Sequence, residues 1–127
     1  MSKRKIIIVD DNPDVLEILK EKLGEHFKDM EIVDFVDPEQ AAIAIENEKD
    51  IEALVTDLKM PKLDGRELAK KAQKSKPDLP VFLRTGYSDE MTDKDMKDSG
   101  IQNVVSKDDK TDTILMDLLS SLKKEES

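Results

Sequence analysis

Short runs of apolar residues recur along the chain, and polar residues bound each run. The runs are Ile6–Val9, Ile32–Val36, Ala53–Val55, Val81–Leu83 and Val104–Val105. Runs this short, bounded by polar residues, are typical of strands that are buried on both faces. Successive runs lie roughly 20 to 28 residues apart, which leaves room for one helix between each pair. The pattern therefore predicts an α/β domain with a parallel sheet.

Apolar side chains between these runs follow the spacing of a helix, in which one face turns toward the core. Two stretches show this spacing most clearly. They contain Val15, Leu16, Ile18, Leu19 and Leu23, and Ile114, Leu115, Leu118, Leu119 and Leu122. A weaker helix is expected over Asp89–Ser99, where only two methionines form the apolar stripe and Gly100 is placed to end the helix.

Residues that favour helix starts stand at the expected positions. Asn12-Pro13 and Asp37-Pro38 each place a capping side chain before a proline that suits the first helical turn. Gln40 stands three residues after the second cap, as in a capping box. Asp64 precedes Glu67 by the same spacing, so we expect it to be an N-cap and not a ligand.

Composition limits the classes of protein that fit. Charged residues form 40% of the chain and would permit disorder, but the periodic apolar pattern indicates a folded domain. The formal charge of −9 argues against nucleic acid and anionic membranes as partners. Cysteine is absent, which excludes disulfides and thiolate sites.

The length of 127 residues suits one domain. We expect that domain to span 1–122, followed by a frayed tail at 123–127, with no output domain. The longest apolar run, Ala41–Ile45, is far too short to span a bilayer. The basic start is followed by only four apolar residues before Asp10, so we expect no export signal and a cytoplasmic location.

Polar residues with chemical potential follow four of the five runs. Asp10 and Asp11 follow the first, Asp57 the third, Thr85 the fourth and Lys107 the fifth. Ligands of open parallel sheets bind beyond the carboxyl ends of the strands, where the strand order reverses. With the order 2-1-3-4-5, three carboxylates meet there and must share protons or hold a cation. Oxygen ligands alone favour magnesium, or manganese, and the added hydroxyl and lysine suit the handling of a phosphoryl group.

These residues carry a resemblance to a known family. The sequence resembles the receiver domains of bacterial two-component response regulators in its segments IIIVDDNPD and LVTDLKMPKLDG, in Thr85 after VFLR and in Lys107 after NVVS. The resemblance covers essentially the whole chain. It implies a flavodoxin-like, doubly wound (βα)5 fold, a three-layer sandwich around a five-stranded parallel sheet of order 2-1-3-4-5.

The resemblance also implies roles for the acidic residues. Asp57 is the expected phosphoacceptor, which forms an aspartyl phosphate. Asp11, Asp57 and the backbone carbonyl of Lys59 are the expected ligands of Mg²⁺ or Mn²⁺, and Asp10 is expected to bind through a metal-bound water.

The same resemblance assigns Lys107 to the phosphoryl oxygens and Thr85 to a switch that turns toward them. The implied partners are a sensor histidine kinase or a histidine phosphotransfer protein, and a downstream protein. The chain is not expected to be an enzyme beyond catalysing its own phosphorylation and dephosphorylation.

The sequence departs from the family at positions that usually report phosphorylation. Most members carry an aromatic residue where this chain has Val104, and a proline where it has Asp108. Gly86 follows Thr85 where alanine is common, and Tyr87 comes next. The phosphorylation residues are therefore complete, while the residues that relay the change are altered.

Other functions fit less well. A haloacid-dehalogenase-type phosphatase normally has a second aspartate two residues after the nucleophile, where this chain has Lys59. A flavodoxin-like cofactor binder needs a phosphate loop rich in Ser, Thr and Gly at the position of Asp10 and Asp11. The remaining alternative is a receiver that acts as a protein-interaction module without phosphorylation.

We predict that Tyr87 takes the switch role that Val104 cannot perform, and that Tyr87 and Lys59 prolong the phosphoryl state by crowding the attacking water. Tyr87→Ala is expected to raise the dephosphorylation rate several-fold, which corresponds to about 1 kcal/mol of barrier. It is also expected to weaken the amide-exchange response of residues 89–99. Val104→Ala is the control, and it is expected to leave the dephosphorylation rate and the amide-exchange response unchanged. If Val104→Ala abolishes the response while Tyr87→Ala has no effect, the prediction is contradicted.

Overall fold

The computed structural model describes residues 4–58, 60, 62–85 and 103–106, with the backbone alone described at 85 and 103–106. The described part contains five strands and three helices, namely β1 (Arg4–Val9), α1 (Pro13–His26), β2 (Met30–Phe35), α2 (Pro38–Asn47), β3 (Ile51–Asp57), α3 (Gly65–Ser75), β4 (Val81–Thr85) and β5 (Asn103–Ser106). The strands pair in parallel in the order β2-β1-β3-β4-β5. The predicted α/β fold and strand order are confirmed.

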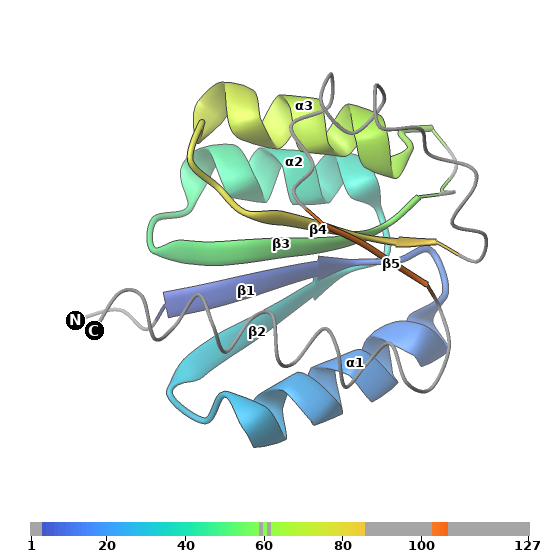
Figure 1. The fold of residues 1–127 in the computed structure, drawn as a ribbon, viewed down its shortest axis with the longest axis vertical. Helices are drawn as coiled ribbons and strands as arrows, with labels where there is room; N and C mark the ends of the chain where they lie inside the picture. Colours follow the sequence, from blue (N-terminus) through green and yellow to red (C-terminus); the bar gives the residue numbers. More distant parts are fainter. Residues whose placement is uncertain (1–3, 59, 61, 86–102, 107–127) are drawn as a thin grey trace.

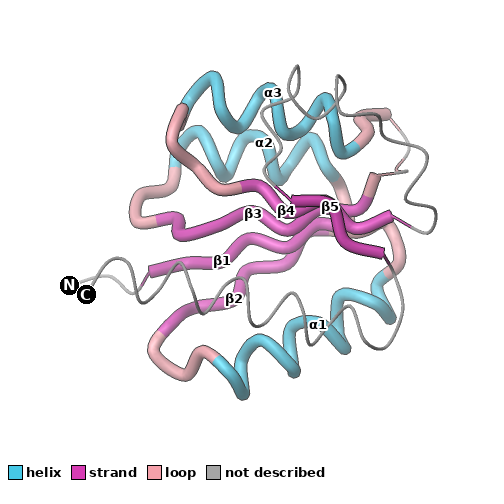
Figure 2. The backbone as a smooth tube through the Cα atoms, in the orientation of Figure 1, coloured by secondary structure: helices cyan, strands magenta, loops and turns pink. Residues whose placement is uncertain are grey.

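The sheet is the middle of three layers. Figure 1 shows α1 on one face and α2 with α3 on the other, and Figure 2 shows the strands as one continuous layer between them. Side chains of β1 alternate between the faces: Ile6 and Ile8 pack with α1, whereas Ile7 and Val9 pack with α2 and α3. Because both faces are covered, the strand interiors must be continuously apolar, as the sequence pattern requires.

The first two helices begin at the predicted caps, with one difference. The side chain of Asn12 accepts a hydrogen bond of 3.0 Å from the backbone N–H of Asp14, which caps α1. The carboxylate of Asp37 accepts a 2.9 Å bond from the N–H of Glu39. The capping box expected with Gln40 is wrong, because the carboxylate bonds to the second helical residue and not to the third.

The start of α3 is fixed more tightly than those of the other two helices. Asp64 accepts a 2.9 Å bond from the N–H of Glu67, whose side chain accepts a 3.4 Å bond from the N–H of Asp64, so this capping box forms. The N–H of Gly65 donates a 2.8 Å bond to the carbonyl of Leu58, just beyond β3. These bonds hold the helix start against the carboxyl end of β3.

Several predicted features lie outside the described residues. They are the helices expected at 89–99 and 114–122 with Gly100, and the domain end and tail at 122 and 123–127, all of which stay predictions. In the portion of the chain with a described structure, no helix is both long and apolar enough to cross a membrane.

The close approach of α3 to β3 depends on a glycine. A Cβ atom at Gly65 would collide with the carbonyl oxygen of Asp57 and lie 2.6 Å from Cδ1 of Leu83. We expect Gly65→Ala to lower the free energy of unfolding by about 1–3 kcal/mol, as overpacking of a dense core does. Urea denaturation measures this change.

Gly24→Ala is the matched control. A Cβ atom at Gly24, inside α1, meets nothing within 4 Å. Because alanine favours helix more than glycine does, this variant is expected to raise the free energy of unfolding by about 0.5–1 kcal/mol. Equal effects of the two substitutions would contradict the proposed packing constraint.

Candidate functional site

Three carboxylates meet at the carboxyl end of the sheet. Asp10 and Asp11 directly follow β1, and Asp57 is the last residue of β3, the neighbour of β1 in the sheet. Ligand oxygens of the three residues lie within 4.8 Å of one another. Parallel pairing therefore brings together residues that are more than 45 positions apart in the sequence.

Asp10 is held in place by its own turn. It is 1% exposed, and its backbone N–H donates a 3.2 Å bond to the carbonyl of Phe35 at the end of β2. Its Oδ1 accepts a 2.9 Å bond from the N–H of Asn12. Because Asn12 itself caps α1, Asp10 is not the helix cap that a purely structural role would make it.

Two hydrogen bonds fix the backbone around Asp57. The hydroxyl of Thr56 donates a 3.0 Å bond to the carbonyl of Asp57 and lies 4.0 Å from the sulfur of Met60. The next N–H, that of Leu58, donates a 3.0 Å bond to the carbonyl of Arg84 on β4. Asp57 is 4% exposed, and these two bonds hold its backbone at the end of β3, beside Asp10.

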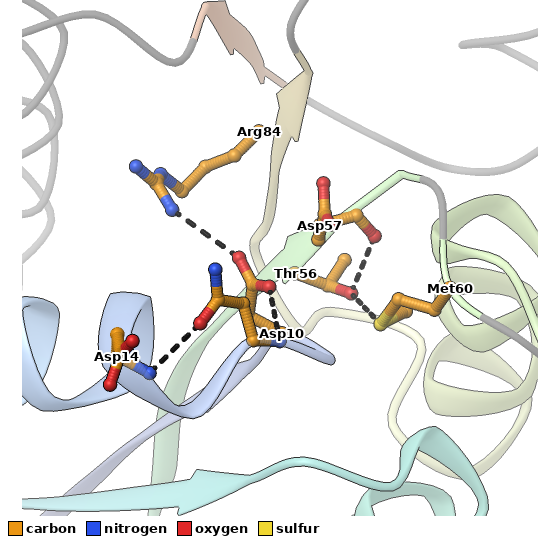
Figure 3. Close-up of polar contacts among 7 residues, drawn as sticks. Asp10, Asp14, Thr56, Asp57, Met60 and Arg84 are labelled. Carbon is orange, nitrogen blue, oxygen red and sulfur yellow. Dashed lines mark hydrogen bonds and ion pairs between the residues drawn. The ribbon is translucent and has the colours of Figure 1, made fainter.

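The structure adds one charged residue that the sequence analysis missed. Arg84 is 7% exposed, and its Nη1 lies 3.7 Å from Oδ2 of Asp10. Figure 3 shows the guanidinium group directed from β4 toward Asp10. The sequence did carry a signal, since a charge directly after the apolar run Val81–Leu83 falls within a buried strand.

The cluster suits a small divalent cation. Its ligands are all oxygen atoms, two carboxylates are buried, and Asp11 is exposed and connects the cluster with solvent. Carboxylate repulsion at this separation favours a bound cation, and magnesium accepts one or two carboxylates together with water and phosphate oxygens. The acidic residues thus fit the metal that the sequence analysis expected.

The other predicted site residues are only partly placed. Thr85 is the last residue of β4. The residue before it, Arg84, pairs with Asp57 of β3, so the backbone of Thr85 lies at the same edge of the sheet as the acidic cluster. The remaining predictions lie outside the described residues. They concern Lys59, Gly86, Tyr87, Lys107 and Asp108.

Comparison with known proteins identifies the family. Residues 6–119 match the family described as response regulator receiver domain. The chain belongs to this family. The resemblance inferred from the motifs is therefore confirmed, and with it a place in two-component signalling.

Curated relatives share this domain. The chain is 32% identical over 88 residues to the response regulator receiver protein CpdR of Brucella abortus, which covers 67% of this chain and 68% of that protein. It is also 32% identical over 87 residues to the response regulator protein PilR of Pseudomonas aeruginosa, covering 68% of this chain. This match covers only 19% of the length of PilR.

Solved structures confirm the receiver fold. A CheY-like receiver domain protein from Methanospirillum hungatei is 26% identical, with a TM-score of 0.80 and 98% of each chain covered. The response regulator TrrA from Thermotoga maritima, solved in complex with Mg²⁺ and BeF, is 28% identical with a TM-score of 0.81. That match covers 94% of this chain and 98% of TrrA.

The crowding of the carboxylates predicts a gain in stability when one charge is removed. In EDTA and at low ionic strength, Asp57→Asn is expected to raise the free energy of unfolding by about 1 kcal/mol, because it relieves repulsion from Asp10 and Asp11. Urea denaturation measures the gain, which should shrink as salt screens the charges.

Glu31→Gln is the control, since Glu31 is an exposed acid on β2. Removing this surface charge is expected to change stability by less than about 0.5 kcal/mol. An Asp57→Asn variant no more stable than the unmodified chain would show that the acidic residues do not repel one another.

Proposed function

We propose that this receiver domain is a phosphorylation-dependent switch that accepts a phosphoryl group on Asp57. The observation that carries the proposal is the position of Asp57 at the end of β3, with its carboxylate within 4.8 Å of ligand oxygens of Asp10 and Asp11. A structural acid at a strand end needs no such neighbours, whereas phosphoryl chemistry needs a nucleophile beside a cation site.

The proposed metal is Mg²⁺ or Mn²⁺, held by Asp11, Asp57 and the backbone carbonyl of Lys59, with Asp10 acting through water. When bound, it would neutralise charge on the phosphoryl oxygens. The complex of TrrA with Mg²⁺ and BeF supports this assignment by family membership. The oxygen-only ligand set of the present cluster supports it independently.

The chain's own residues supply nucleophile and orientation. A carboxylate oxygen of Asp57 forms a bond to phosphorus while the bond from phosphorus to the donor breaks, and the donor retains the electron pair. The bonds from Thr56 and Leu58 keep the backbone at Asp57 fixed during this exchange. Lys107 and Thr85 are proposed to bind the phosphoryl oxygens once they arrive.

The proposed donors are a sensor histidine kinase or a histidine phosphotransfer protein, as is general for receiver domains. The phosphorylated form would change the face formed by residues 89–106 and the helix expected at 114–122, and a downstream protein would bind it. The proposed location is the cytoplasm, where such donors present their phosphohistidine. The domain would turn over no substrate other than its own phosphoryl group.

Acetyl phosphate tests the proposal directly. In the presence of MgCl₂, intact-mass spectrometry is expected to show the addition of one phosphoryl group, because the donor is small enough to reach the cluster beside exposed Asp11. Asp57→Asn is expected to abolish labelling by removing the nucleophile, and EDTA to abolish it by removing the metal.

Asp64→Asn is the matched control, since it removes a nearby acid at the start of α3 while asparagine still caps the helix. It is expected to label as the unmodified chain does. If Asp57→Asn is labelled as fully as the unmodified chain, the assignment of Asp57 as the phosphoacceptor is wrong. Partner binding without any labelling would instead favour the interaction module.

A further inference from the structure

Arg84 is a buried charge at the edge of the acidic cluster that the proposed phosphoryl chemistry does not use. It lies on β4 directly beside Asp57 of β3 in the parallel register. Its strand neighbours Phe82 and Leu83 belong to the two apolar cores, and the whole residue is 7% exposed. Burying a guanidinium group costs free energy unless an opposite charge compensates it.

The compensating charge is Asp10, which lies across β3 from Arg84. Neighbouring strands are about 4.8 Å apart, so the side chain reaches past β3 to the end of β1. Its Nη1 lies 3.7 Å from Oδ2 of Asp10, and the two side chains are 8% and 2% exposed. The other oxygen, Oδ1, accepts the bond from the N–H of Asn12. Both oxygens of Asp10 therefore already face positive or donor groups (Figure 3).

We propose that Arg84 is a built-in counter-cation of the acidic cluster that competes with the divalent metal for Asp10 and so lowers metal affinity. The inference rests on the proposed metal site. Arg84 offsets part of the negative charge of the three carboxylates when no metal is bound. A divalent cation that enters must approach a buried positive charge, and burial strengthens the repulsion between them.

Arginine suits this role better than lysine. Its planar group is more weakly hydrated than an ammonium group, so it tolerates burial beside a carboxylate. The competition acts whenever the side chain faces Asp10. The receiver would thus fold with a partly neutralised site and bind metal weakly until a phosphoryl group adds negative charge.

Calorimetric titration with MgCl₂ tests the competition. Arg84→Met keeps an unbranched apolar stem but removes the charge, and it is expected to bind Mg²⁺ about tenfold more tightly, equal to ~1.4 kcal/mol. Arg84→Lys keeps the charge and is expected to stay within about threefold of the unmodified chain, since the repulsion persists. Lys20→Met removes one positive charge from an exposed ion pair with Asp34 and is expected to leave the affinity unchanged.

A second measurement needs no metal. In EDTA, Arg84→Met is expected to lower the urea midpoint because Asp10 is left buried beside a neutral group. The same substitution in an Asp10→Asn background is expected to lower the midpoint less, since the buried charge is gone. This background also supplies a folded variant if Arg84→Met alone fails to fold.

The outcomes separate the inference from the proposed function. Mg²⁺ binding of equal affinity in the unmodified chain and Arg84→Met would overturn the role of Arg84 and leave the metal site intact. If Arg84→Met lowers the urea midpoint in EDTA by the same amount in both backgrounds, the pairing of Arg84 with Asp10 would also be overturned. Absence of Mg²⁺ binding in every variant would overturn the metal site and, with it, the competition.

Discussion

The mutual repulsion of three carboxylates is the main physical constraint on this structure. Ligand oxygens of Asp10, Asp11 and Asp57 lie within 4.8 Å of one another, a separation at which like charges repel strongly. Such a cluster lowers stability, so a fold selected only for stability would not assemble it. The residues around it reduce that cost: a backbone N–H donates to Asp10, and the guanidinium group of Arg84 faces the same carboxylate.

Dense packing keeps these charges in place. The carboxylates stand on strand ends whose neighbours are buried on both faces of the sheet, and Gly65 lets α3 begin directly against the backbone of Asp57. The site is therefore attached to the rigid core through β3 and through the start of α3. A change of charge at Asp57 acts on backbone that cannot absorb it locally, which favours a response in neighbouring elements over a response within the site.

Membership of the receiver family gives this arrangement its context in two-component signalling. The family match covers residues 6–119 and solved relatives share the fold over nearly the whole chain. Among the features of the present chain, a buried arginine beside the acidic cluster stands out, because it introduces a resident cation into a site suited to a mobile one. In the proposed metal site, affinity would then depend on a residue that is not itself an oxygen ligand.

The sequence by itself determined the strands, the starts of α1, α2 and α3, and the acidic residues at the strand ends, because periodicity and capping are local signals. Its motifs also indicated the family. Only the tertiary structure decided that Asp10 is buried while Asp11 is exposed, and that Arg84 reaches Asp10 across β3. These features depend on which strands lie side by side and on how far a side chain extends between them, and no local pattern along the chain records such distances.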